Sequence, residues 1–224
     1  MSAVDPDRYQ GFPDGFFGRM DESADQRFYE MPRLVLHIDD EAVAEVSRLY
    51  AELDLPSGDV LDLMSSWVSH QPTQPRRLVV LGMNAEELAL NEHAHEVVIR
   101  DLNSDPALPF DDGSFDAVTC CVSVDYLTRP IEVFDEVARV LRPGAPFVCT
   151  FSNRCFPTKA VRGWLAVDDA THCALVAEYF RRARLRDDSG ASGPAFDEPV
   201  AELRNPGLPG DPLYAVWARR RSAV

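Results

Sequence analysis

The chain has 224 residues and a mass of 25.0 kDa, which suits one domain with a sizeable hydrophobic core. Hydrophobic residues make up 46% and charged residues 26%, values that exclude a wholly disordered chain, a collagen and a disulfide-held miniprotein. The formal net charge of −15 repels phosphate backbones and anionic lipid headgroups. We therefore expect neither nucleic acid nor a membrane as a partner.

The first residues lack the charged and then apolar pattern of a secretory signal, which favours the cytoplasm. No stretch approaches the ~20 apolar residues of a membrane span. The five cysteines are an odd set without a CxxC pair, which is typical of reduced thiols. His93 and His95 have no further ligands at zinc spacing, so no metal site is expected.

The N-terminal residues 1–30 are rich in Pro, Gly, Asp and aromatic residues and show no regular period. We therefore predict that residues 1–38 form an arm that packs on a single domain, residues 39–224. Asp39 is a candidate helix N-cap, and the apolar residues after it follow helical spacing as far as Leu53.

Short, nearly continuous apolar runs then predict buried strands. These strands are residues 59–63, 78–82, 96–100, 115–122 and 146–151. Helical patterns accompany them at residues 85–91, 131–141 and 170–185. Strands that alternate with helices imply parallel βαβ units, and hence an α/β, doubly wound, mostly parallel sheet.

Two connections and the C-terminus complete the predicted topology. The first crossover, residues 64–77, contains two prolines and has room for only a turn or two of helix. Residues 187–195 are predicted to be a surface loop. The alternating residues 212–219 are predicted to pair with a weaker strand near 199–203 as an antiparallel hairpin at the sheet edge.

Two sequence blocks carry a family resemblance. Residues 108–118, LPFDDGSFDAV, resemble the LPFxDxSFDxV block of class I S-adenosylmethionine-dependent methyltransferases, and residues 134–144, FDEVARVLRPG, resemble their xEhxRVLxPGG block. The stretch VLDL at 60–63 matches the first strand of that family. The resemblance implies a Rossmann-like sheet with a reversed edge strand. It also implies S-adenosyl-L-methionine as cofactor, bound at the carboxyl ends of the strands.

The sequence departs from the family at the turn after the first strand. The family has a glycine-rich DLGCGxG there, whereas residues 64–67 read MSSW. Glycine allows positive φ and a close approach to a ligand. Met64 and Trp67 are bulky, so either the turn has another shape or the pocket is partly filled. Asn84 stands where the family usually carries an acid for the ribose hydroxyls, and an amide cannot act as a bidentate carboxylate.

The resemblance implies a set of cofactor-binding residues along these segments. They are Asp62, Met64, Ser65, Ser66, Met83, Asn84, Asp101, Leu102 and Cys120. Asp101 and Leu102 match the position at the adenine end of the ligand. Asp62 lies in an apolar strand and needs hydrogen-bond partners, from a loop or beside the cofactor. Cys120 is either a small buried hydrophobe or part of the pocket wall.

Three residues are candidates for catalysis. Asp125 is a candidate general base, and Tyr126 a candidate cation–π wall for a methyl sulfonium group. The alternative is a solvated loop acid beside a packed aromatic ring. His70, just after the altered turn, is a second candidate proton acceptor, although a lone histidine is more often packed or exposed.

A polar loop after the fifth strand is the candidate acceptor site. Residues 152–159 read SNRCFPTK, and Asn153, Arg154 and Lys159 offer donors to a carboxylate or phosphate. Tyr29 joins them because, in the resembled fold, the segment before the first helix often folds over the cofactor. The alternative is a lid loop held by ordinary surface pairs.

The favoured function is an S-adenosylmethionine-dependent methyltransferase that acts on a small-molecule acceptor, since no separate substrate domain is evident. One alternative is a methyltransferase-like binding or regulatory protein with weakened or lost cofactor binding. Another is an enzyme that keeps the fold but carries out different chemistry.

Overall fold

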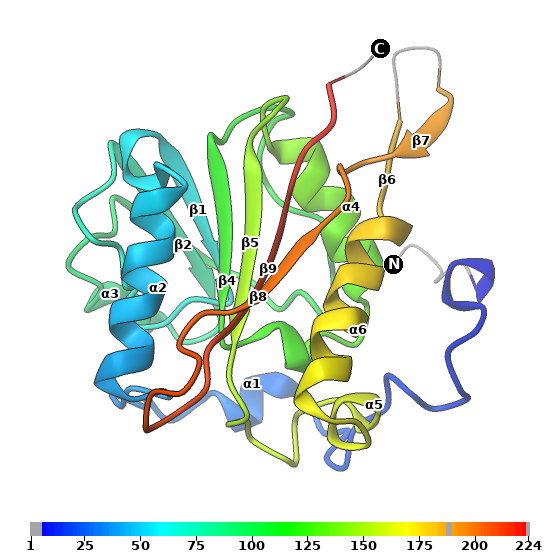
Figure 1. The fold of residues 1–224 in the computed structure, drawn as a ribbon, viewed down its shortest axis with the longest axis horizontal. Coiled ribbons are helices and arrows are strands. Elements are labelled where there is room, and N and C mark those ends of the chain that lie inside the picture. Colours follow the sequence, from blue (N-terminus) through cyan, green and yellow to red (C-terminus); the bar gives the residue numbers. More distant parts are fainter. Residues whose placement is uncertain (1–5, 187–189, 223–224) are drawn as a thin grey trace.

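A single large sheet organises the computed structural model, which describes residues 6–186 and 190–222 (Figure 1). Its strand order is β3-β2-β1-β4-β5-β9-β8. The parallel strands are β1 (Asp59–Leu63), β2 (Arg77–Gly82), β3 (Glu96–Ile99), β4 (Ala117–Cys121) and β5 (Pro146–Phe151). The antiparallel edge strands are β8 (Val200–Leu203) and β9 (Tyr214–Arg219). The predicted doubly wound sheet with an antiparallel edge hairpin is confirmed.

Helices cover both faces of this sheet. On one face lies α2 (Asp40–Glu52), whose apolar side packs on β1 and β2, with the short α3 (Ala85–Ala89) beside it. On the other face lie α4 (Pro130–Val140) and α6 (Asp169–Arg182). Asp39 caps α2 as predicted, because its carboxylate accepts a hydrogen bond from the Ala42 amide. The remaining short helices are η1 (Pro6–Tyr9), α1 (Asp25–Phe28), η2 (Leu55–Ser57), η3 (Val124–Tyr126) and α5 (Arg162–Leu165).

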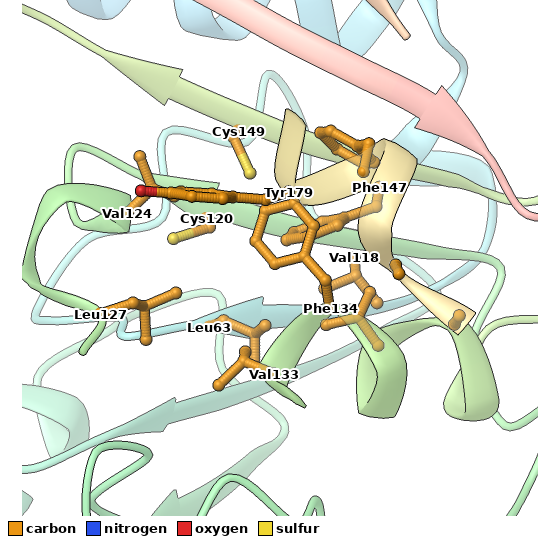
Figure 2. Close-up of a cluster of buried hydrophobic side chains, with 14 of the residues drawn as sticks. Leu63, Val118, Cys120, Val124, Leu127, Val133, Phe134, Phe147, Cys149 and Tyr179 are labelled. Atoms are coloured by element: carbon orange, nitrogen blue, oxygen red, sulfur yellow. The ribbon is translucent and has the colours of Figure 1, made fainter. Parts of the chain in front are cut away.

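The core between the sheet and helices α4 and α6 is rich in aromatic rings. Figure 2 shows side chains from β4, β5, α4 and α6 converging there. The ring of Phe134 lies 4.8 Å from that of Phe147 and 5.7 Å from that of Tyr179. The continuous apolar runs of the central strands follow from this burial on both faces.

Two connections differ from the sequence prediction. The crossover after β1 contains no helix, because Pro72 and Pro75 lack the amide protons that helical turns need. Within the predicted loop 187–195, residues Ser192–Pro194 form strand β7, which pairs with β6 (Arg184–Arg186). Residues 187–189 lie outside the described part of the chain.

The N-terminal segment lies along the domain and passes beneath the sheet to α1 (Figure 1). Phe17 packs 6.1 Å from Tyr179 of α6, ring to ring. The amide of Gly163 in α5 donates to the carbonyl of Phe16 over 2.8 Å. These contacts bring the following residues, 25–37, to the carboxyl ends of the strands. Among the described residues, no helix is long and apolar enough to cross a membrane.

Candidate functional site

The main cleft opens where the central parallel strands end. Its wall includes Leu63, Gly82 and Cys121, the last residues of β1, β2 and β4. Because β1 lies between β2 and β4, the cleft is at the place where the strand order reverses. This is the position at which the family resemblance predicts a ligand.

Asp62 orders the turn that follows β1. The residue is only 2% exposed, and its carboxylate accepts hydrogen bonds from Ser65 Oγ at 2.6 Å and Thr119 Oγ1 at 2.7 Å. Burial raises the pKa of Asp62, and the hydroxyl donors oppose that rise. The same residue lines the cleft, so Asp62 bonds the turn and also lies at the edge of the predicted ligand space.

The glycine-poor turn retains a backbone shape that glycine favours. Met64 has a φ of 53°, in the left-handed region. The Ser65 amide donates to the Leu81 carbonyl over 2.8 Å. A Cβ atom at Gly82 would lie 2.5 Å from the Ser65 carbonyl oxygen. The turn therefore packs closely on the end of β2, and Gly82 permits that approach.

Hydrogen bonds connect the residues after this turn to α3 and to the arm. Ser66 Oγ donates to Glu87 Oε2 over 2.6 Å, and Asn91 Nδ2 donates to the Ser66 carbonyl over 3.1 Å. Trp67 Nε1 donates to the Val35 carbonyl over 3.3 Å. Ser66, Trp67 and Val35 all line the cleft. The altered turn is thus part of the cleft wall and connects with the arm.

Asn84 uses both ends of its amide within the protein. Its Oδ1 accepts from the amides of Glu86 and Glu87 at 2.9 and 3.0 Å, which caps α3. Its Nδ2 donates to the carbonyl oxygens of Tyr29 at 2.8 Å and Glu30 at 3.4 Å. Asn84 therefore lines the cleft while it holds the arm in place.

The residues predicted at the adenine end also line the cleft. Asp101 and Leu102 belong to its wall, and so does Met83, another predicted cofactor-binding residue. The Asp101 carboxylate accepts from the Asn103 amide at 3.0 Å and from Ser104 Oγ at 2.6 Å, which fixes its orientation.

Two predicted site residues lie in the core instead of on the cleft wall. Cys120 is 1% exposed and faces Cys149 of β5 in the strand register, whereas Cys121 lines the cleft. Asp125 is 3% exposed, so it is not the solvated loop acid of the alternative prediction. Its Oδ2 has no hydrogen-bond partner among the described residues, and burial raises its pKa to about 8. The structure brings neither Cys120 nor Asp125 to the cleft.

Tyr126 and His70 do lie on the cleft wall. Tyr126 is 7% exposed, and its hydroxyl oxygen accepts from the Phe156 amide over 2.9 Å. Burial lowers the pKa of His70 to about 4, so its imidazole is neutral at pH 7. His37 of the arm also lines the cleft, with its ring edge-on to Phe156 at 5.3 Å. Burial also lowers the pKa of His37, so both imidazoles that line the cleft favour the neutral form.

The loop after β5 contributes a different residue from those predicted. Arg154 is 59% exposed and pairs with Asp211 over 3.2 Å, and Asn153 is exposed. Neither residue belongs to the cleft wall, whereas Phe156 does. The prediction that Asn153 and Arg154 face the acceptor is not supported by this placement. Tyr29, the fourth predicted acceptor residue, lines the cleft.

Lys159, the only lysine in the sequence, holds the arm instead of facing the cleft. It is 1% exposed, and its Nζ lies 3.0 Å from the Asp25 carboxylate and 3.1 Å from that of Asp21. Nζ also donates to the Ser23 carbonyl over 2.8 Å. Arg19 also pairs with Asp25, at 2.7 Å. This buried network fixes α1, from which Asp25 lines the cleft.

Many residues of the cleft wall were not among the predicted site residues, and Arg33, Glu87 and Phe156 are three of them. Glu87 follows the cap residue Asn84 by three positions, the spacing of a capping box, and that signal places it beside the first turn of α3. Arg33 and Phe156 carry no comparable local signal, because long-range packing decides which way they face.

Comparison with known proteins agrees with the fold. Residues 69–149 match the family described as a methyltransferase domain. A methyltransferase structure from Archaeoglobus fulgidus aligns over 81% of this chain and 94% of its own, with 15% identity and a TM-score of 0.55. Residues 69–149 thus resemble a methyltransferase domain, and the chain shares the fold of solved methyltransferases. The matched segment begins after the altered turn at 64–67, so that turn lies outside it.

Two further comparisons indicate how far the likeness extends. A putative methyltransferase from Haloferax volcanii, solved in complex with the Trm112 activator, aligns over 82% of this chain and 92% of its own, with 14% identity and a TM-score of 0.54. A demethylmenaquinone methyltransferase from Clavibacter sepedonicus is 47% identical over 51 residues. That stretch covers 22% of this chain and 21% of the relative. These likenesses establish a shared fold and a shared local segment.

The cleft chemistry fits S-adenosylmethionine, the cofactor that the family resemblance implies. The acidic residues Asp62 and Asp101 and the aromatic residues Trp67, Tyr126 and Tyr29 all line one cleft. An acidic wall with aromatic rings suits both a sulfonium cation and a purine ring. The residues present therefore fit the group.

Proposed function

We propose that the protein is an S-adenosylmethionine-dependent methyltransferase that acts on a small-molecule acceptor. The observation that carries the proposal is the cleft at the ends of β1, β2 and β4, which keeps Asp62 and Asp101 in its wall although the adjacent turn is altered. A degenerate site would not need to keep a buried carboxylate with two ordered hydroxyl donors.

When bound, S-adenosylmethionine supplies an electrophilic methyl group on a sulfonium centre. The protein's part is to position the acceptor and to remove a proton where the acceptor is a hydroxyl or an amine. His70 is suited to that task, because its imidazole is neutral and lines the cleft. Tyr126 contributes an aromatic wall for a cationic group.

A small acceptor is supported by the way in which the arm covers the cleft. Tyr29, Leu36 and His37 of the arm contribute to the cleft wall together with Phe156. A chain segment of a macromolecular substrate would have to displace them. The charge of −15 also opposes a nucleic-acid acceptor.

The second candidate function is a methyltransferase-like binding protein with weakened cofactor affinity. The observation that favours it is the commitment of Asn84 to the arm, which leaves no acid at the usual ribose position. The two candidate functions differ because only the enzyme converts S-adenosylmethionine to S-adenosylhomocysteine.

Turnover is tested by measuring S-adenosylhomocysteine release with a panel of small phenols, amines and carboxylic acids. The enzyme interpretation expects release with at least one acceptor. It also expects the rate of release to fall roughly a hundredfold in His70→Asn, because a general base contributes a factor of about that size. His93→Asn, outside the cleft wall, is the matched control. Cofactor binding without release from any acceptor, protein extracts included, would favour the binding protein.

A further inference from the structure

Arg33 is a cleft-lining cation that has no carboxylate partner in the described part of the chain. Arg100, the other arginine in the cleft wall, pairs with Asp105 at 2.5 Å. No carboxylate among the described residues lies within ion-pair distance of Arg33. One long hydrogen bond, of 3.4 Å, joins its Nη1 to the Met31 carbonyl. The Arg33 guanidinium therefore keeps most of its donors for a ligand.

The Arg33 guanidinium is also held in place before any ligand arrives. Its Cζ atom lies 4.3 Å from the ring centre of Phe28, 5.6 Å from that of Phe156 and 5.9 Å from that of Tyr29. Its backbone amide donates to Glu87 Oε1 over 2.7 Å. Stacking against rings and a fixed backbone reduce the entropy lost when a planar guanidinium binds an anion.

Other cations near the cleft are already engaged. Lys159 is buried between Asp21 and Asp25, and Arg154 is exposed and paired with Asp211. An anionic ligand in this cleft therefore meets Arg33 as the available charged donor among the described residues.

We propose that Arg33 binds the carboxylate of a small ligand in the cleft. The proposal rests on the proposed function, since the carboxylate belongs either to the methyl acceptor or to the amino-acid end of the cofactor. The rings of Tyr29 and Phe156 beside it favour the acceptor, because a planar aromatic acid would stack on them while its carboxylate meets the guanidinium.

The test compares wild type with Arg33→Gln by calorimetric titration. One arm uses S-adenosylhomocysteine against 5′-methylthioadenosine, which lacks the amino-acid group. The other uses benzoate against benzyl alcohol, with and without saturating S-adenosylhomocysteine. Arg27→Gln is the matched control, because Arg27 is exposed, lies in the same arm and is outside the cleft wall. Arg33→Lys keeps the positive charge but loses the bidentate guanidinium geometry, so it should weaken binding less than Arg33→Gln.

For an acceptor carboxylate, Arg33→Gln weakens benzoate binding by roughly tenfold to a hundredfold and leaves S-adenosylhomocysteine unchanged. If the carboxylate belongs to the cofactor, Arg33→Gln weakens the binding of S-adenosylhomocysteine by a similar factor and leaves the binding of 5′-methylthioadenosine unchanged. The proposal is overturned if wild type shows no preference for the carboxylate member of either pair. It is also overturned if both carboxylates bind Arg33→Gln within about twofold of wild type.

The proposed function can fail separately. The proposed function fails if wild type binds neither S-adenosylhomocysteine nor 5′-methylthioadenosine. In that case the benzoate titration without an adenosine ligand still tests whether Arg33 binds a carboxylate. A thermal unfolding curve for each variant shows whether it is folded. If Arg33→Gln does not fold, Arg33→Lys decides the outcome in the same two arms.

Discussion

The side-chain amide of Asn84 donates a hydrogen bond to the backbone carbonyl of Tyr29 over 2.8 Å. This bond joins the end of β2 to the arm at the position where related proteins usually carry an acid. An acid there could not donate to a carbonyl, so the asparagine and the covering arm belong to one arrangement. The departure from the family pattern therefore serves the position of the arm as well as the cap of α3.

Glu87 should matter for cofactor affinity as well as for stability. Its carboxylate joins the Ser66 hydroxyl to the Arg33 amide, so Glu87→Gln removes a charged acceptor from a buried site. We expect a loss of about 1–3 kcal/mol in the free energy of unfolding, and weaker S-adenosylhomocysteine binding. Glu86→Gln, at an exposed position in the same first turn of α3, controls for the helix dipole and should change both by little. Equal effects of the two variants would contradict the role of Glu87.

Met64 should carry conformational strain. Its φ of 53° costs about 1 kcal/mol for a residue with a Cβ atom and almost nothing for glycine. Met64→Gly and Met64→Ala remove nearly the same side chain, so their difference isolates the backbone effect. We expect Met64→Gly to be about 1 kcal/mol more stable than Met64→Ala in denaturant unfolding. An alanine variant as stable as the glycine variant would show that the turn relaxes.

Lys159 should be required to hold the N-terminal arm against the domain. Lys159→Met leaves the Asp25 and Asp21 carboxylates with fewer partners, and breaking a buried pair costs about 3 kcal/mol or more. The variant should unfold at lower denaturant and be cut sooner by protease within residues 19–31. Arg154→Met removes an exposed pair from the same loop and should cost under about 1 kcal/mol. Similar losses in both variants would contradict a special role for the buried lysine.

Asp125 should make the protein less stable as the pH rises. Its pKa is about 8 in the folded state against 3.8 for the free carboxyl, so between these values the folded protein keeps a proton that the unfolded chain has lost. The contribution is fully present below about pH 4 and is lost towards pH 8, by at most about 1.4 kcal/mol per unit. Asp125→Asn should flatten this slope, and exposed Asp111→Asn should not. Equal slopes in wild type and Asp125→Asn would contradict the buried, neutral carboxyl.

The sequence predicts the strands well because a strand that is buried on both faces consists of a nearly continuous run of apolar residues. The runs at β1 and β5 have the predicted bounds, and the Asp39 cap follows from the helical spacing after it. The cleft residues next to strand ends, Asp62 and Asp101, were predictable for the same reason. Their position is set by the strand that precedes them.

The acceptor side could not be predicted as well, because it depends on contacts far apart in the chain. Within the loop after β5, the sequence favours Arg154 and Lys159 on charge. Lys159 is buried by acids about 135 residues earlier in the chain, however, and Phe156 faces the cleft. Arg33 likewise owes its place to rings from α1 and from that loop.

The central claim is that the altered turn still admits the cofactor, and calorimetric titration with S-adenosylmethionine and S-adenosylhomocysteine tests it most directly. We predict a Kd in the micromolar range, about −8 kcal/mol, which Asp101→Ala weakens by roughly tenfold or more. No heat of binding and no thermal shift at millimolar ligand would contradict the claim. The covered cleft would then have to serve a different ligand.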